Sequence, residues 1–87
     1  MYVVYIIKNL ERRNVLYIGF TDDLSRRLKE HNAGFSDFTK KFAPWKLAYC
    51  EGYASEQDAR DREKQLKHFG KVYSQLKRRI LRSLQSK

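Results

Sequence analysis

The chain has 87 residues, of which 41% are hydrophobic and 14% are aromatic, a composition that excludes a disordered tail. Its length predicts one domain, residues 1–87, with a single hydrophobic core. Nineteen Lys and Arg residues against ten Asp and Glu residues give a formal net charge of +9, which produces a positive field that attracts phosphate backbones.

Two strands joined by a hairpin loop are predicted at the start of the chain. Tyr2–Ile7 is an unbroken run of β-branched and aromatic residues, typical of a strand buried on both faces, and Val15–Phe20 is a second such run. The polar segment between them carries Asn at both ends, as hairpin loops do. If the hairpin is symmetric about Glu11, Tyr5 lies opposite Tyr17 and both phenols project from one face of the sheet.

A helix is predicted after Thr21-Asp22-Asp23, which supplies an N-cap, and it ends near Gly34, a C-cap signal. One face of this helix carries four residues at i, i+3, i+4 and i+7 spacing: Leu24, Arg27, Leu28 and His31. Two of the four are polar where core packing favours apolar side chains, which indicates a functional or strained site. The alternative is that Arg27 and His31 lie at the edge of the stripe, with Arg27 reaching solvent. Residues 35–44 are predicted to form a basic loop.

The second half of the chain predicts one strand and two helices. Trp45–Tyr53 has the alternating pattern of a third strand. Ser55 and Asp58 form a variant capping box for a helix that runs to about His68 and is broken by Gly70. A third helix directs four apolar residues inward: Val72, Leu76, Ile80 and Leu84. This order of elements predicts an α/β (α+β) fold, in which a small, mainly antiparallel three-stranded sheet is flanked by three helices.

A carboxylate stands on the apolar face of the second predicted helix. Glu63 shares an i, i+4, i+7 face with Ala59 and Leu66, and a partly buried carboxylate must find a cation or a metal. The spacing leaves two interpretations open: a salt bridge to Arg27 or Arg60, and a metal ligand in a phosphate-processing site.

The strand motifs become specific only in combination. Tyrosines in strands are more often packing residues than catalysts, and a glycine that precedes a helix lets another backbone or a ligand approach closely. Together, Val3-Val4-Tyr5, Tyr17-Ile18-Gly19, Arg27 and His31 resemble the motif of the GIY-YIG nuclease superfamily, with Val3 in place of the first glycine. The resemblance covers Tyr2 to about Leu66 and is to the small stand-alone bacterial members and to the catalytic domain of the excision-repair nuclease subunit.

This resemblance implies a divalent-metal-dependent endonuclease that hydrolyses a phosphodiester bond of DNA, in repair or processing. The family's catalytic residues correspond to five positions of this chain: Tyr5, Tyr17, Arg27, His31 and Glu63. Glu63 is implied as the ligand of one Mg²⁺ or Mn²⁺ ion. A further polar residue that the family often carries late in the domain has no clear counterpart here.

The chemistry of phosphodiester hydrolysis predicts a role for each residue. Glu63 holds the ion at the scissile phosphate, and Arg27 contacts a phosphate oxygen. Tyr5 orients or deprotonates the attacking water. His31 and Arg27 lower the pKa of the Tyr5 phenol or relay its proton, and Tyr17 completes the hydrogen-bond network. A further set of basic residues is expected to track phosphates without reading bases: Lys40, Lys41, Lys46, Lys64, Lys67, Lys71, Lys77, Arg78 and Arg82.

Other functions fit parts of the sequence less well. The main alternative is a non-catalytic nucleic-acid-binding module on the same fold, which would not nick DNA in magnesium. A zinc site built from His31, Cys50 and His68 lacks a paired short spacing, and Cys50 fits better as a small core residue. The basic last helix lacks a bulky aromatic face for binding a membrane surface.

The start of the chain and its cysteine content predict the compartment. Met1–Ile7 has no basic leader and is too short to span a bilayer, and a single cysteine does not depend on an oxidising environment. We expect a cytoplasmic monomer or weak homo-oligomer without membrane contact, acting alone or within a larger repair complex.

Overall fold

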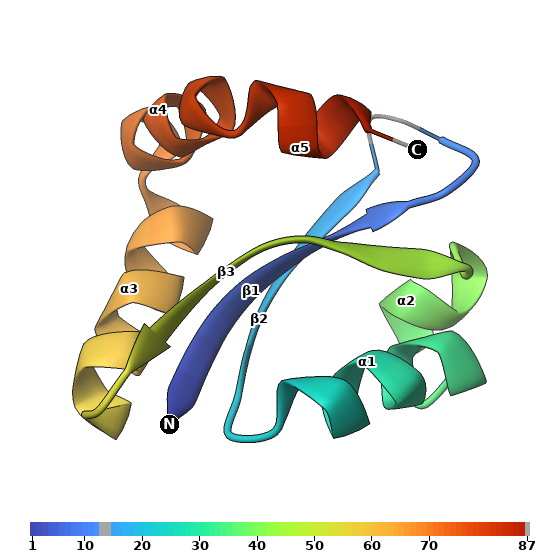
Figure 1. Ribbon diagram of the computed structural model, residues 1–87, viewed down its shortest axis with the longest axis horizontal. Helices are drawn as coiled ribbons and strands as arrows, with labels where there is room; N and C mark the ends of the chain where they lie inside the picture. Colours follow the sequence, from blue (N-terminus) through green and yellow to red (C-terminus); the bar gives the residue numbers. More distant parts are fainter. Residues whose placement is uncertain (13–14, 87) are drawn as a thin grey trace.

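A computed structural model describes residues 1–12 and 15–86 of the chain. The elements in these residues are, in order, β1 (Tyr2–Asn9), β2 (Leu16–Thr21), α1 (Leu24–Ala33), α2 (Asp37–Lys41), β3 (Trp45–Tyr53), α3 (Glu56–His68), α4 (Gly70–Arg79) and α5 (Leu81–Gln85). The strands form one antiparallel sheet in the order β2-β1-β3, which confirms the predicted α+β fold (Figure 1). Arg13 and Asn14, at the end of the predicted hairpin loop, lie outside the described residues.

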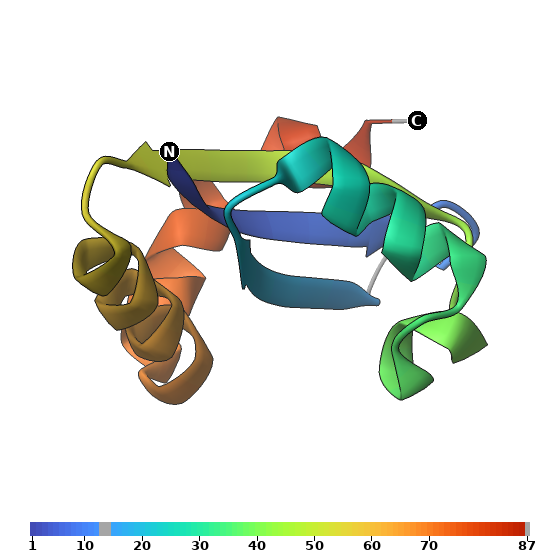
Figure 2. The ribbon, with the colours of Figure 1, turned by 90° about the horizontal axis from the view of Figure 1, so that it is seen from below.

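Helices cover both faces of the sheet. In Figure 1, α3, α4 and α5 lie on one side of the strands, and α1 and α2 lie on the other. Figure 2, viewed from below, places α1 in front of the strands and α4 behind them. The core on the α3 side contains six buried residues: Val4, Ile6, Ile18, Ala59, Leu66 and Leu76. The core on the α1 side contains three: Tyr5, Ile7 and Trp45. Because the central strand β1 alternates its side chains between two cores, its sequence is apolar from Tyr2 to Ile7.

The register of the β1–β2 hairpin differs from the prediction by two residues. Tyr5 lies opposite Gly19, and Tyr17 lies opposite Ile7, so the predicted direct pairing of the two tyrosines is wrong. A shift of two residues returns each side chain to the same face, because side chains alternate with a period of two. Tyr5 and Tyr17 therefore still share the α1 face, as predicted.

The hairpin loop explains this shift. The side-chain oxygen of Asn9 accepts hydrogen bonds from the backbone N–H groups of Glu11 (2.8 Å) and Arg12 (2.6 Å), so the turn starts at Asn9 itself. The backbone N–H of Asn9 donates to the carbonyl of Val15 (3.0 Å), which centres the hairpin beyond Glu11.

The helices differ from the prediction in number, since the described residues form five rather than three. The predicted basic loop, residues 35–44, contains α2, which buries Thr39 completely. The predicted third helix is divided into α4 and α5 at Ile80, whose φ of −109° lies outside the helical range. Cys50, predicted as a core residue, is exposed on the edge strand β3. Across the described ranges, no helix has the length and apolar composition needed to cross a membrane.

Candidate functional site

The predicted catalytic side chains come from four elements and meet at the edge strand β2. Tyr5 on β1, Tyr17 on β2 and His31 on α1 are in contact, with the His31 ring centre 5.0 Å from that of Tyr17. Arg27 lies one turn before His31 on α1 and acts electrostatically on Tyr5. Glu63 on α3 pairs with Lys67, whose Nζ lies 5.8 Å from the ring centre of Tyr17. The structure therefore brings all five residues to one edge of the sheet.

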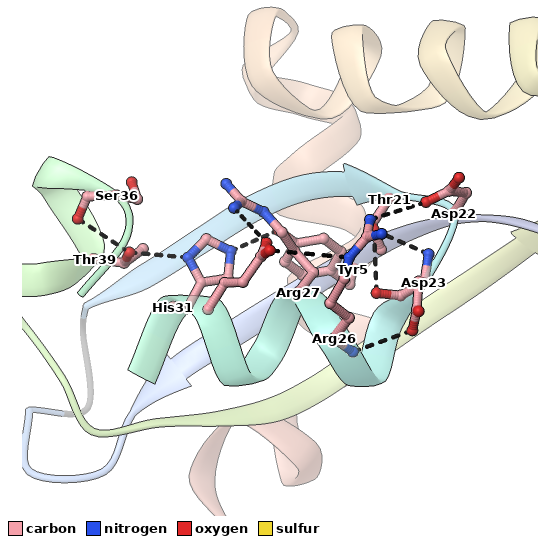
Figure 3. A network of polar contacts seen from close by, with 10 residues as sticks. Tyr5, Thr21, Asp22, Asp23, Arg26, Arg27, His31, Ser36 and Thr39 are labelled. Atoms are coloured by element: carbon pink, nitrogen blue, oxygen red, sulfur yellow. Dashed lines mark hydrogen bonds and ion pairs between the residues drawn. The ribbon is translucent and has the colours of Figure 1, made fainter. Parts of the chain in front are cut away.

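Tyr5, His31 and Thr39 form a buried chain of hydrogen bonds (Figure 3). The Tyr5 hydroxyl lies 2.7 Å from Nε2 of His31, and Nδ1 of His31 lies 2.9 Å from Oγ1 of Thr39. The Thr39 hydroxyl donates to the carbonyl of Ser36 (3.4 Å) and so accepts a hydrogen bond from Nδ1–H. In this arrangement Nε2 of a neutral His31 carries no proton and accepts from the Tyr5 hydroxyl.

Burial keeps both Tyr5 and His31 in their neutral forms. It raises the pKa of Tyr5 to about 12, and the Arg27 guanidinium opposes only part of this rise. Burial lowers the pKa of His31, and the positive charge of Arg27 lowers it further. Arg27 therefore lowers the Tyr5 pKa, as predicted, but burial outweighs this effect and the net shift is upward. The pair is instead a neutral phenol that donates to a neutral imidazole.

Gly19 makes room for the Tyr5 ring. A Cβ atom at position 19 would lie 2.2 Å from the Tyr5 hydroxyl oxygen, because the two residues are directly opposed across the hairpin. Any other residue would displace the phenol from His31. The glycine thus allows a close approach, but by the Tyr5 side chain rather than by the backbone or ligand that the sequence predicted.

Arg27 borders a polar cleft between α1 and α3. The cleft measures about 420 Å³ and is lined by three arginines, Arg26, Arg27 and Arg60, together with the acidic residues Asp22, Glu30 and Glu56. One N–H group of Arg27 donates to Glu30 (3.0 Å), and 30% of the Arg27 side chain is exposed. Its guanidinium is thus held between Glu30 and Tyr5 with one side open to an anion.

Glu63 pairs with Lys67 one turn later on α3, at 3.0 Å, rather than with Arg27 or Arg60 as one interpretation of the sequence predicted. Both residues line a second polar cleft of about 360 Å³. The described residues contain no cluster of three or more His, Cys, Asp or Glu side chains placed to share a metal. A single half-buried carboxylate fits Mg²⁺, which is commonly bound through one or two carboxylates, with water and substrate phosphate as further ligands.

The predicted phosphate-tracking residues divide between the two helical layers. Lys64 and Lys67 on α3 lie in the cleft with Glu63. Lys40 and Lys41 belong to α2 on the opposite layer, and Lys46 is the second residue of β3. The remaining four lie on the terminal helices: Lys71, Lys77, Arg78 and Arg82. Of the nine residues, the structure thus places two beside Glu63.

Sequence patterns did not identify Thr39, Glu30 or a polar cluster on the α3 face. In this cluster Glu51 accepts hydrogen bonds from the hydroxyls of Tyr49 (2.7 Å) and Tyr53 (2.5 Å) and pairs with Arg62 at 3.0 Å. The pair joins β3 to α3. The sequence feature that could have indicated this cluster is Glu51 itself, a charged residue at an inward position of the alternating strand β3.

The tyrosines of this cluster predict a loss of stability at alkaline pH. Burial and the hydrogen bonds to Glu51 raise the pKa values of Tyr49 and Tyr53 from 10.0 to about 12. Because the folded state holds these protons more tightly, their contribution is complete below pH 10 and is lost as the pH rises from 10 to about 12. The free energy of unfolding, measured with urea between pH 8 and pH 12, should decline more steeply with pH for the wild type than for the double variant Tyr49→Phe/Tyr53→Phe. Equal slopes would contradict this assignment.

Comparison with known proteins gives consistent matches to one family. Residues 1–80 match the family model described as the GIY-YIG catalytic domain. A UPF0213 protein of Staphylococcus haemolyticus is 38% identical over 69 residues, which cover 78% of this chain and 82% of the relative. A UPF0213 protein of Halobacterium salinarum is 33% identical over 73 residues, which cover 83% of this chain and 92% of the relative. One from Streptococcus pneumoniae is 44% identical over 52 residues, 59% of this chain, and the match spans about half of that relative (52%).

Proposed function

This chain belongs to the GIY-YIG family of nuclease domains, and on that premise we propose that it is a metal-dependent endonuclease that hydrolyses phosphodiester bonds of DNA. The observation that carries the proposal is the meeting of Tyr5, Tyr17, Arg27, His31 and Glu63 at the edge of β2. A nucleophile, a stabiliser of phosphoryl charge and a metal ligand are the groups that this reaction requires.

Arg27 stabilises the negative charge that accumulates on the scissile phosphate. Its guanidinium lies beside Tyr5, where the attacking water would be, and borders a cleft wide enough for a phosphodiester. The guanidinium presents a planar set of N–H donors that matches phosphate oxygens. Glu30 holds this group at 3.0 Å and fixes its orientation before substrate binds.

Tyr5 and His31 take up the proton of the attacking water. As the water oxygen bonds to phosphorus, the water proton passes to the Tyr5 oxygen while the Tyr5 proton moves to Nε2 of His31. The phenol therefore never ionises, which its raised pKa makes unfavourable. The P–O3′ bond breaks, and O3′ leaves with its electron pair and takes a proton from solvent. Tyr17 packs against the His31 ring and limits its movement.

Glu63 is the residue that would hold the divalent ion, Mg²⁺ or Mn²⁺. When bound, the ion supplies charge neutralisation at the scissile phosphate and the leaving oxygen. Lys67 is the present partner of the carboxylate and borders the same cleft, so it is placed to pair with a phosphate once Glu63 binds a cation.

A cleavage assay tests the proposal directly. Labelled single-stranded, duplex, flap and branched DNA, with RNA counterparts, would be incubated with the protein in magnesium and in chelator. We expect magnesium-dependent nicking of at least one DNA substrate. Salt-sensitive binding without nicking of any substrate would favour the alternative, a non-catalytic nucleic-acid-binding module on the same fold.

Thr39 is expected to act as a positioning residue for His31. Thr39→Val keeps the shape of the side chain but leaves Nδ1–H without an acceptor, so His31 gains the tautomer that donates to Tyr5 and cannot take its proton. We expect kcat to fall roughly tenfold to a hundredfold, the usual cost of losing a partner that orients a functional histidine, with little change in KM.

The matched control for this prediction is Thr39→Ser, which restores the hydroxyl and should restore activity. Nitrogen chemical shifts of His31 report the tautomer independently of turnover. Full activity in Thr39→Val with an unchanged tautomer would show that Thr39 only fills space.

The wider setting of the enzyme is also part of the proposal. We place it in the cytoplasm, in DNA repair or processing, as a monomer or weak homo-oligomer that works alone or in a larger repair complex. A single cysteine and a net charge of +9 support a cytoplasmic, nucleic-acid-directed role.

A further inference from the structure

An apolar groove lies beside the proposed active site. It measures about 310 Å³, near the lower end of the roughly 300–1,000 Å³ typical of ligand pockets. Its lining includes three aromatic rings, those of Tyr17, Phe38 and Tyr73, together with Leu66 and Lys67. Tyr17 belongs to both the groove and the catalytic cluster, so an occupant of the groove would lie next to the scissile bond.

The rings of the groove are partly open and arranged for stacking. Tyr17 and Phe38 are nearly parallel, with ring centres 5.8 Å apart and an interplanar angle of 27°. Phe38 is 45% exposed although its ring also contacts Phe42 and Trp45, so part of this side chain remains accessible. An exposed aromatic side chain held by neighbouring rings is a preformed platform for another flat ring.

The groove adjoins the two polar clefts. Lys67 lines both the groove and the cleft of Glu63, and Arg60 lines both that cleft and the cleft of Arg27. Cations also stand over the groove rings, since Nζ of Lys67 lies 5.8 Å from the Tyr17 ring centre and Nζ of Lys77 lies 4.5 Å from that of Tyr73. The polar clefts, in which arginine and lysine side chains lie among carboxylates, lead to an aromatic groove and so place donors for phosphates beside a surface for flat bases.

We propose that this groove holds an unstacked nucleobase of the substrate, next to the scissile phosphate, between Phe38 and Tyr73. The inference rests on the proposed function and adds a substrate class to it, because a base can enter the groove only where the strand is unpaired. The enzyme therefore cuts single-stranded segments or the unpaired arms of branched molecules. An apolar protein segment would fill the groove but would not contact the arginine and lysine side chains of the polar clefts that adjoin it.

The test uses a flap substrate, whose junction fixes the register of the unpaired arm, with 2-aminopurine at each position of that arm in turn, bound in chelator so that no cleavage occurs. On the wild-type protein, we expect strong quenching at one position. Phe38→Leu and Tyr73→Leu should each remove this quenching and weaken binding by roughly 5- to 150-fold, the range for one stacked base. Tyr73→Phe keeps the ring and should keep both the quenching and the binding affinity of the wild type.

Two controls accompany these variants. Phe35→Leu is the matched change at a ring that is 73% exposed and is not among the described residues lining the groove, and it should leave both signals unchanged. Melting curves verify that each variant is folded. The duplex of the same sequence should show no quenching at a single position.

The outcomes separate this inference from the proposed function. Two results would overturn the base site: uniform quenching in the wild type, or Phe38→Leu and Tyr73→Leu variants that behave as Phe35→Leu does. Magnesium-dependent cleavage would still support the nuclease proposal in either case. Quenching at one position that is lost in both leucine variants supports the base site. If no substrate is cut in magnesium at the same time, the nuclease proposal alone fails.

Discussion

Replacing Arg27 with glutamine is expected to lower kcat for phosphodiester cleavage by about 100- to 1,000-fold and to leave the fold intact. Glutamine retains hydrogen-bonding capacity but removes the positive charge beside Tyr5. The stability change should stay below about 1 kcal/mol, because the Arg27–Glu30 pair is partly exposed and Arg26 remains 3.9 Å from Glu30. Single-turnover cleavage of labelled DNA at saturating protein measures the chemical step.

The neighbouring Arg26 provides a matched control for this prediction. Arg26→Gln removes the same charge from the same helix, but its side chain is 58% exposed and pairs with Asp22. We expect a change of only a few fold, mainly in KM and sensitive to salt, as for any surface charge near a polyanion. Equal losses in the two variants would show that Arg27 acts through general attraction rather than at the reacting phosphate.

The sheet and the shared face of the tyrosines could be predicted because both depend on local periodicity. The apolar run of β1 and the alternation of β3 indicate strands from neighbouring residues alone. The face of Tyr5 and Tyr17 was predicted correctly despite the wrong register, since an error of two residues preserves the face. The stripe with Arg27 and His31 likewise needs only the helical period.

The partners of the site residues could not be predicted, because they depend on contacts between distant segments. Thr39 lies in α2, a helix of five residues, which is too short to show helical periodicity within a polar segment. Its hydrogen bond to His31 spans eight positions and arises only when α2 folds back on α1. Glu51 and Arg62 similarly come together from β3 and α3. Spacing therefore identified which side chains are unusual, and packing determined what each one contacts.

Glu63→Gln is expected to abolish the magnesium dependence of cleavage together with nearly all of the activity. Loss of a residue that hydrogen-bonds to a metal ligand lowers activity or metal affinity about 10- to 100-fold. Loss of the sole proposed carboxylate ligand should therefore lower activity more than about a hundredfold. Glutamine matches the shape of glutamate, and the Lys67 pair that it loses is partly exposed, so the fold should persist. Activity measured across a magnesium titration, and manganese binding measured by electron paramagnetic resonance without DNA, read the ligand role separately from turnover.

Glu56 offers the matched control on the same helix. Glu56→Gln removes a carboxylate that is 53% exposed and paired with Arg60, whereas the Glu63 side chain is 21% exposed beside Lys67. Since both substitutions raise the net charge by one, general attraction for DNA should rise equally in the two variants. Cleavage should therefore persist within a few fold in Glu56→Gln and disappear in Glu63→Gln. Magnesium-dependent cleavage that survives in Glu63→Gln would place the metal elsewhere and leave the carboxylate as a partner of Lys67 alone.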